Sequence, residues 1–252
     1  MKNTNKLLFN SISELLRELD DSSPIPGRSC ASEDHDGGPG SSWCDTTGYD
    51  QAHEWLKFGH EYEGLETDLS KYKSNTGKET PRQFLDVVGY TPVVPLYLQG
   101  VPTCMLNQKK ALNNKIATFV YQLSVPCGVN QKDIMKTTTE LMKNIIKLEK
   151  DGYRVNLYVM NYNDNDNGYG YMIKLKTDRE TLNIKKLCFP LVSSSMLRRI
   201  DFRVKERLYK DWIGGGYGHG HNSETEIKQF VEDMLHLKHY ELWDYRGKQY
   251  TL

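Results

Sequence analysis

The sequence lacks a net charge, a long apolar run and a secretory signal, and each absence excludes a class of protein. Lys+Arg and Asp+Glu number 33 each, so no global charge points to a polyanionic partner, and nucleic-acid binding would need a local basic patch. No apolar run approaches the roughly 18–20 residues that cross a bilayer. The start of the chain has no sustained apolar segment followed by a cleavage site of small residues, so we do not expect a signal peptide.

Cysteines are few and scattered. Five occur in 252 residues, an odd number without regular spacing: Cys30, Cys44, Cys104, Cys127 and Cys188. Since no secretory signal is expected, they are more typical of reduced thiols than of a disulfide framework.

Residues 115–161 carry the clearest pattern. A β-rich apolar run over 116–125 leads through a short loop into a helical pattern of about twenty residues, which ends at Asp151 and Gly152, and a second β-rich run follows at once. This order predicts a βαβ unit and therefore a parallel pair of strands. We expect an α/β fold, a three-layer Rossmann-like sheet with an N-terminal helical extension.

The remaining patterns divide the chain into four parts. Residues 1–20 form an amphipathic helical arm, which either packs on its own chain or docks on a partner. Residues 21–47 are rich in Pro, Gly, Ser and Asp and predict a flexible linker. Residues 48–83 form a small helical segment, and residues 84–252 form the α/β domain. Within the latter, the prolines between 84 and 102 favour an edge strand or a wrapping segment.

The loop after the first strand of the βαβ unit is a candidate ligand edge, because ligands bind beyond the carboxyl ends of parallel strands. Its candidate residues are Ser124, Cys127, Gly128 and Asn130. The loop matches neither G-x-G-x-x-G nor the phosphate-binding loop G-x-x-x-x-G-K-[ST], so a plain connection is the alternative. Cys127 lies near a helix N-terminus and is either an activated nucleophile or a small buried thiol.

A glycine-dense tract over 212–222 is the second candidate. It predicts a flexible loop formed by Gly214, Gly215, Gly216, Tyr217 and Gly218, followed by the possible metal ligands His219 and His221. No C-x-x-C or H-x-x-x-H spacing supports a zinc site. A divalent metal is therefore not expected, and the pattern indicates no other cofactor.

A positive cluster lies on the helical pattern that follows residue 195. It consists of Arg198, Arg199, Arg203, Lys205 and Arg207, with aromatic neighbours. Such a helix either binds nucleic acid or a partner, or is a solvated face of the molecule.

The order of strand, polar loop, long helix and second strand in 115–161 resembles the opening of a von Willebrand factor A-type domain. Those domains carry D-x-S-x-S after the first strand, where the aspartate and serines ligate a divalent cation. In the equivalent stretch of this chain, residues 122–127, the aspartate is absent and only Ser124 matches. The resemblance implies this type of sheet without its metal site.

Four segments together resemble an uncharacterised family encoded by bacteriophages and prophages, over roughly residues 84–218. They are residues 84–95, 97–105, 195–200 and 215–218. The resemblance implies a viral setting, in the cytoplasm of a bacterial host or within the virion, and no catalytic residue.

These observations favour a non-enzymatic, phage-encoded protein that binds a partner protein, a second copy of itself or nucleic acid, in virion assembly or DNA packaging. The alternative is a metal- or nucleotide-dependent enzyme whose site lies between the 124–130 loop and the 212–222 tract.

Overall fold

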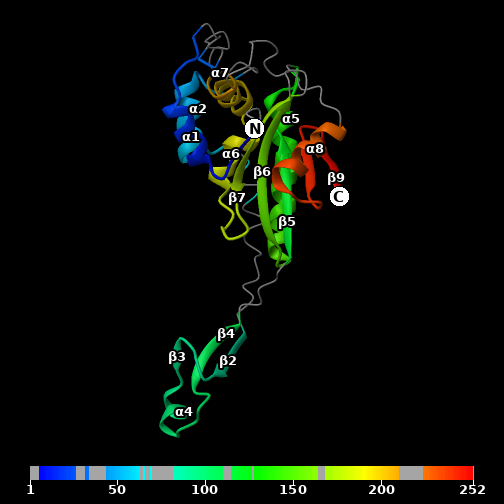
Figure 1. Cartoon of the computed structure of the whole chain (residues 1–252). Helices are drawn as coiled ribbons and strands as arrows, with labels where there is room; N and C mark the ends of the chain where they lie inside the picture. The colour runs from blue at the N-terminus through cyan, green and yellow to red at the C-terminus, as the bar shows by residue number, and fades with distance from the viewer. Residues whose placement is uncertain are drawn as a thin grey trace.

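The computed structural model describes residues 6–26, 32–33, 44–62, 65, 69, 82–109, 115–126, 128–163, 168–209 and 224–251. The fold is mixed α/β: helices pack on a six-stranded mixed sheet, and a second sheet has three strands (Figure 1). None of the described helices is long and apolar enough to cross a bilayer.

The large sheet has the strand order β1-β7-β6-β5-β8-β9. Parallel pairs are β1–β7, β5–β6 and β5–β8, whereas β6–β7 and β8–β9 are antiparallel. The predicted βαβ unit is confirmed, since β5 and β6 are parallel and joined by helix α5. The strands are β1 (Lys6–Phe9), β5 (Ile116–Gln122), β6 (Arg154–Asn163), β7 (Tyr169–Lys176), β8 (Glu241–Asp244) and β9 (Gly247–Thr251).

Helix α5 (Gln131–Lys150) is defined by its caps and by one apolar face. The Asn130 side chain accepts a hydrogen bond from the Asp133 amide at the N-terminus. Gly152, just beyond the last turn, has φ of 84°, a conformation that favours glycine. The buried face includes Leu141 and Ile145 and packs on the sheet.

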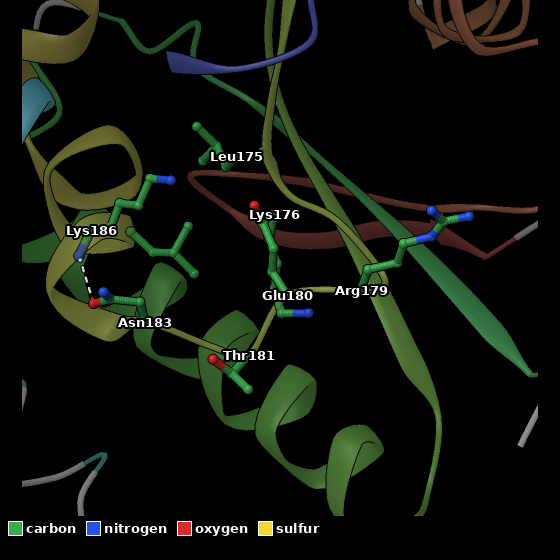
Figure 2. A pocket seen from close by; sticks show the side chains of 8 residues that line it. Leu175, Lys176, Arg179, Glu180, Thr181, Asn183 and Lys186 are labelled. Carbon is green, nitrogen blue, oxygen red and sulfur yellow. Dashed lines mark hydrogen bonds between the residues drawn. The ribbon is translucent and has the colours of Figure 1, made fainter. Parts of the chain in front are cut away.

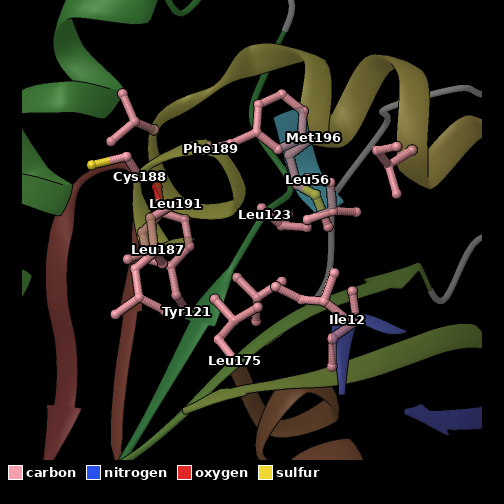
Figure 3. Close-up of a cluster of buried hydrophobic side chains, with 14 of the residues drawn as sticks. Ile12, Leu56, Tyr121, Leu123, Leu175, Leu187, Cys188, Phe189, Leu191 and Met196 are labelled. Atoms are coloured by element: carbon pink, nitrogen blue, oxygen red, sulfur yellow. The ribbon is translucent and has the colours of Figure 1, made fainter. Parts of the chain in front are cut away.

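Helices cover both faces of the large sheet because its strands alternate apolar side chains between them. On one face, Val159 and Tyr171 join the main core with α1, α2, α5, α6, η2 and α7. Figure 3 shows part of this core, with Ile12, Leu56 and Phe189 from three helices near Tyr121 of β5. On the other, Met160 and Met172 pack against Phe230 of α8. The helices not yet bounded are α1 (Ile12–Asp21), α2 (Tyr49–Phe58), α6 (Ile184–Val192), the π-helical turn η2 (Met196–Asp201), α7 (Phe202–Leu208) and α8 (Glu224–Leu235).

The N-terminal segment is integrated into the main core. Strand β1 pairs with β7 at the edge of the sheet, and Leu15 and Leu19 of α1 are buried among the core side chains. Of the two predicted locations for the amphipathic arm, the structure shows packing on its own chain. Ser32 and Thr46 lie in the predicted flexible linker, yet both are fully buried.

Residues 82–109, here called the apolar module, form the second sheet. Its order is β2-β4-β3, with antiparallel pairing throughout. Figure 1 shows the module apart from the large sheet. The predicted single α/β domain over 84–252 therefore contains two separate sheets. The module's elements are β2 (Arg82–Asp86), β3 (Thr91–Pro92), α4 (Val94–Leu98) and β4 (Met105–Lys109).

Candidate functional site

At the carboxyl end of β5, the predicted ligand edge is occupied by hydrogen bonds within the fold. Ser124 Oγ accepts a hydrogen bond from Gln122 Nε2 at 3.0 Å and donates to Asn161 Oδ1 at 2.5 Å. Gln122 and Asn161 are both buried. The Ser124 hydroxyl thus joins the ends of β5 and β6, a bond that holds the sheet edge together.

The other members of the predicted edge also have structural roles or lie outside the described residues. Asn130 uses its side chain to cap α5. Gly128 is exposed, and a Cβ added there would meet nothing within 4 Å, so no close approach requires a glycine. Cys127 lies outside the described residues. The edge matches the plain connection better than a ligand site.

Three serines between α6 and η2 form a polar junction that the sequence analysis did not single out. Ser195 Oγ lies within 3.0 Å of three donors, the amides of Asp45 and Thr46 and the Thr46 hydroxyl. Ser193 Oγ donates to the Asp45 carboxylate at 3.0 Å. The Ser194 amide donates to Gln131 Oε1 at 2.9 Å. This junction ties η2 to the segment before α2 and to the start of α5; the run of three serines was its only signal.

The predicted basic helix is largely inside the molecule. Arg199 is 1% exposed, and Arg198 and Lys205 are also buried. Lys205 Nζ lies 3.0 Å from Asp201 Oδ2, and Arg199 Nη1 donates to the Ser32 carbonyl oxygen at 3.2 Å. These three side chains therefore do not form an exposed positive face in this structure.

Burial of η2 on all sides explains this difference. A regular helical period places Arg198 and Arg199 opposite the apolar side chains of this segment. In the structure every residue from Met196 to Asp201 is buried, so both faces of the π-helical turn are covered. A distant segment contributes to this cover, since Ser32 accepts the hydrogen bond from Arg199.

The remaining basic residues bind the segment that crosses the helix. Arg203 pairs with Glu33 and its guanidinium lies 4.4 Å from the centre of the Tyr49 ring. Arg207 Nη1 donates to the Ser22 carbonyl oxygen at 2.6 Å. The basic helix thus holds the N-terminal segment in place.

The same cluster contains a buried carboxylate, Glu206, and two buried tyrosines. Glu206 accepts hydrogen bonds from both the amide and the hydroxyl of Ser32. Burial, and then the charge of Asp201, raise the pKa values of Tyr171 and Tyr209 well above their ordinary range. Neither phenol ionises near neutral pH, so the cluster provides no base or nucleophile from its tyrosines.

A pocket of about 440 Å³ opens where β7 leads toward α6 (Figure 2). Lys186 and Arg179 lie on opposite sides of it, and both are exposed. Lys176, the buried cation of the lining, lies 2.7 Å from the Glu149 carboxylate and donates to the Val155 carbonyl oxygen. Its charge is thus neutralised by the protein itself, and the pocket has no buried group directed at a ligand.

The predicted glycine loop and metal ligands all lie in one tract, residues 212–222. The tract with Gly214, Gly215, Gly216, Tyr217, Gly218, His219 and His221 lies outside the described residues. Among the residues that the structure describes, no three His, Cys, Asp or Glu side chains gather as a metal site. The enzyme alternative places its site between the 124–130 loop and the 212–222 tract, and only the loop lies among the described residues.

The apolar module is the unusual surface of the molecule. Of the eleven large apolar side chains exposed in the described parts of the chain, seven belong to it. Within it, the structure records only Cys104 as buried. No charged residue occurs between Val87 and Gln108, although 26% of the whole chain is charged. The seven exposed residues are Leu85, Val87, Val88, Tyr90, Val94, Tyr97 and Leu98.

A known protein family matches nearly the whole chain. Residues 2–243 match the family model described as Domain of unknown function (DUF7192). The chain belongs to the DUF7192 family. Nothing among the curated proteins or the solved structures matches it. The family match includes the apolar module and all of the large sheet except β9 and the last residue of β8.

Proposed function

We propose that this DUF7192 protein is a non-enzymatic binding protein that docks on a partner protein through its apolar module. The observation that carries the proposal is the exposure of seven large apolar side chains on a module in which, among the side chains that the structure describes, only Cys104 is buried. Soluble monomers rarely expose apolar surface in such concentration, and larger patches mark interaction sites.

The energetics of the module point the same way. Burying one Val or Leu side chain fully stabilises by roughly 1.5–3 kcal/mol. Leu98, Val88 and Tyr97 are 78%, 73% and 66% exposed, so most of that free energy is still available for binding. Three strands are about the smallest sheet that is stable on its own. Packing of a partner on the exposed apolar side chains adds to that stability.

The charge distribution favours protein over nucleic acid as the partner. Phosphate binding requires accessible Lys and Arg, whereas the basic helix buries Arg198, Arg199 and Lys205 within the fold. The stretch from Val87 to Gln108 has no charge. Such a surface is matched by an apolar, uncharged patch on another protein.

The setting of this binding is part of the proposal. Residues 84–95 and 97–105, two of the four segments that resemble the bacteriophage and prophage family, fall within the apolar module. This supports a role in virion assembly or DNA packaging, in the cytoplasm of a bacterial host or within the particle. The β5-α5-β6 unit supports a von Willebrand A-like or Rossmann-like scaffold without the metal-ligating aspartate.

Affinity capture from the native host with matched baits tests the proposal. The altered bait carries Val88→Lys, Tyr97→Lys and Leu98→Lys. The control bait carries Phe58→Lys, which makes the same kind of change at an exposed position of α2, outside the module. We expect one protein to be captured by the wild-type and control baits and depleted at least tenfold with the altered bait. Equal recovery with all three baits would contradict the proposal.

A further inference from the structure

The outer edge of β2 is a second unpaired feature of the apolar module. In the described parts of the chain, β2 hydrogen-bonds only to β4, so its other side presents backbone N–H and C=O groups. The opposite edge strand, β3, is protected because it has two residues and one is Pro92. The edge of β2 is five residues long and contains no proline.

The sequence of β2 is complementary to itself. It begins with Arg82 and ends with Asp86, and the three residues between them are uncharged. If two such strands pair antiparallel about Phe84, Arg82 of each copy stands opposite Asp86 of the other. Opposite charges in directly facing positions of an antiparallel pair are stabilising. A shift of one or two residues in either direction removes both matches.

We infer that two copies of this chain associate through their β2 strands, in antiparallel register about Phe84, to form one continuous six-stranded sheet with the order β3-β4-β2-β2-β4-β3. The interface is isologous, since each copy contributes the same five residues. The formal net charge of the chain is zero at pH 7, so the two copies do not repel each other as whole molecules.

A second copy fits this edge better than the body of the chain fits it. Outside the module, the exposed large apolar side chains of the described residues are scattered as Leu8, Phe58, Ile116 and Leu237. Among the described strands, only β2 carries a basic residue at one end and an acidic residue at the other. The paired sheet also doubles the number of strands that support each module.

This inference rests on the proposed function only in that both assign binding to the module. The two use different parts of it: the partner protein contacts the apolar side chains, whereas the second copy contacts the β2 backbone edge. The paired copies present two apolar surfaces, so the dimer is bivalent toward the partner.

Charge exchange at the two ends of β2 tests the inference on the full chain. Asp86→Arg leaves a strand with two basic ends, and Arg82→Asp leaves one with two acidic ends. Each variant alone places like charges opposite each other twice, so we expect dimer dissociation constants at least about tenfold above wild type. The double variant Arg82→Asp/Asp86→Arg restores opposite charges and the wild-type constant. Glu54→Arg, at an exposed position of α2, is the matched control and leaves it unchanged.

Sedimentation equilibrium reads out the result against the monomer mass of 29.1 kDa. The most decisive experiment mixes the two single variants. We expect them to form a mixed dimer although neither variant associates with itself. Asp86 also accepts a hydrogen bond from the Val87 amide at 2.7 Å; the double variant loses that bond too, so its recovery excludes a folding defect as the cause.

A wild-type chain that stays monomeric at high micromolar concentration overturns the inference, as does a dimer that neither single variant weakens. Either result leaves the proposed function standing if the bait with three lysines still loses its partner. Conversely, an intact charge-dependent dimer with unchanged capture by that bait overturns the proposed function alone.

Discussion

The large-sheet body and the apolar module fold by different means. The body buries its apolar side chains in two clusters on either face of one sheet, and it also buries Arg199, Asp201 and Lys205. The module has three strands and a short helix, yet only Cys104 is recorded as buried within it. The body buries most of its large apolar side chains, whereas the module exposes seven of them to water.

If the module binds as proposed, this difference separates the residues that stabilise the fold from those that bind a partner. In the body, charged residues make contacts within the fold: Arg199 and Arg207 of the basic helix donate hydrogen bonds to the N-terminal segment. In the module, apolar residues remain available. Substitutions in the body should therefore change the free energy of unfolding, and substitutions in the module should change association.

The largest expected effect comes from a buried charge in the body. Asp201→Ala removes the carboxylate 3.0 Å from Lys205 Nζ and leaves that ammonium buried without it. Removing one partner of a buried pair costs about 3–5 kcal/mol. Urea denaturation measures the loss, with Glu54→Ala on the exposed side of α2 as the control. A loss below about 1 kcal/mol would show that the pair is solvated.

Leucine truncation compares the two regions directly. Leu141 is fully buried in the main core, whereas Leu98 is 78% exposed in the module. We expect Leu141→Ala to lower the free energy of unfolding by about 2–5 kcal/mol and Leu98→Ala to change it by about 0.5 kcal/mol at most. The same denaturant titration gives both values. Similar losses in the two variants would contradict the contrast between the regions.

A glycine in the module tests its internal geometry. A Cβ at Gly89 would lie 2.2 Å from the Leu106 carbonyl oxygen, which accepts a hydrogen bond from the Tyr90 amide. We expect Gly89→Ala to open the β3–β4 pairing and speed limited proteolysis within 82–109 severalfold, without lowering the body's unfolding midpoint. Gly128→Ala, with open space at its Cβ, is the control. Unaltered cleavage would show that the backbone there shifts freely.

The smallest effect concerns pH. His60 stacks on Trp55 at 3.5 Å, and its burial lowers the pKa of the imidazole below the usual value near 6.5. The folded chain therefore binds this proton less tightly than the unfolded chain, and the free energy of unfolding falls as pH drops below about 6.5. His60→Gln should make that decline shallower. The same dependence of the unfolding free energy on pH in wild type and the variant would argue against a lowered pKa at His60.

The sequence predicted the central elements because their signals are local. The two β-rich runs, the helical period and the Asp151–Gly152 stop lie within 115–161, and the structure pairs the strands in parallel as expected. The alternation of apolar residues needed no distant contact to be interpreted. The prolines between 84 and 102 favoured an edge strand or a wrapping segment. The structure has Pro92 in the edge strand β3 of a separate sheet and Pro95 in helix α4.

The rest depended on distant contacts or on irregular backbone. Nothing near Ser32 indicates that it meets Glu206, more than 170 residues away, and bonds it twice. The burial of every residue of η2, Arg198 and Arg199 included, depends on distant segments that cover the helix, which a regular helical period cannot foresee. The sequence also did not indicate that the module's apolar side chains are exposed, because an apolar stretch ordinarily predicts burial.

Residue-resolved hydrogen exchange at the lowest workable protein concentration tests the central contrast most directly. In β5 and β6, we expect amides to exchange only through global unfolding, because these strands lie inside the main sheet. In β2 and β4, we expect exchange within minutes through local opening, and slower exchange in β2 as concentration rises and dimers form. If the module's amides are as protected as those of β5 in the dilute monomer, the module is stable without a partner and the account is wrong.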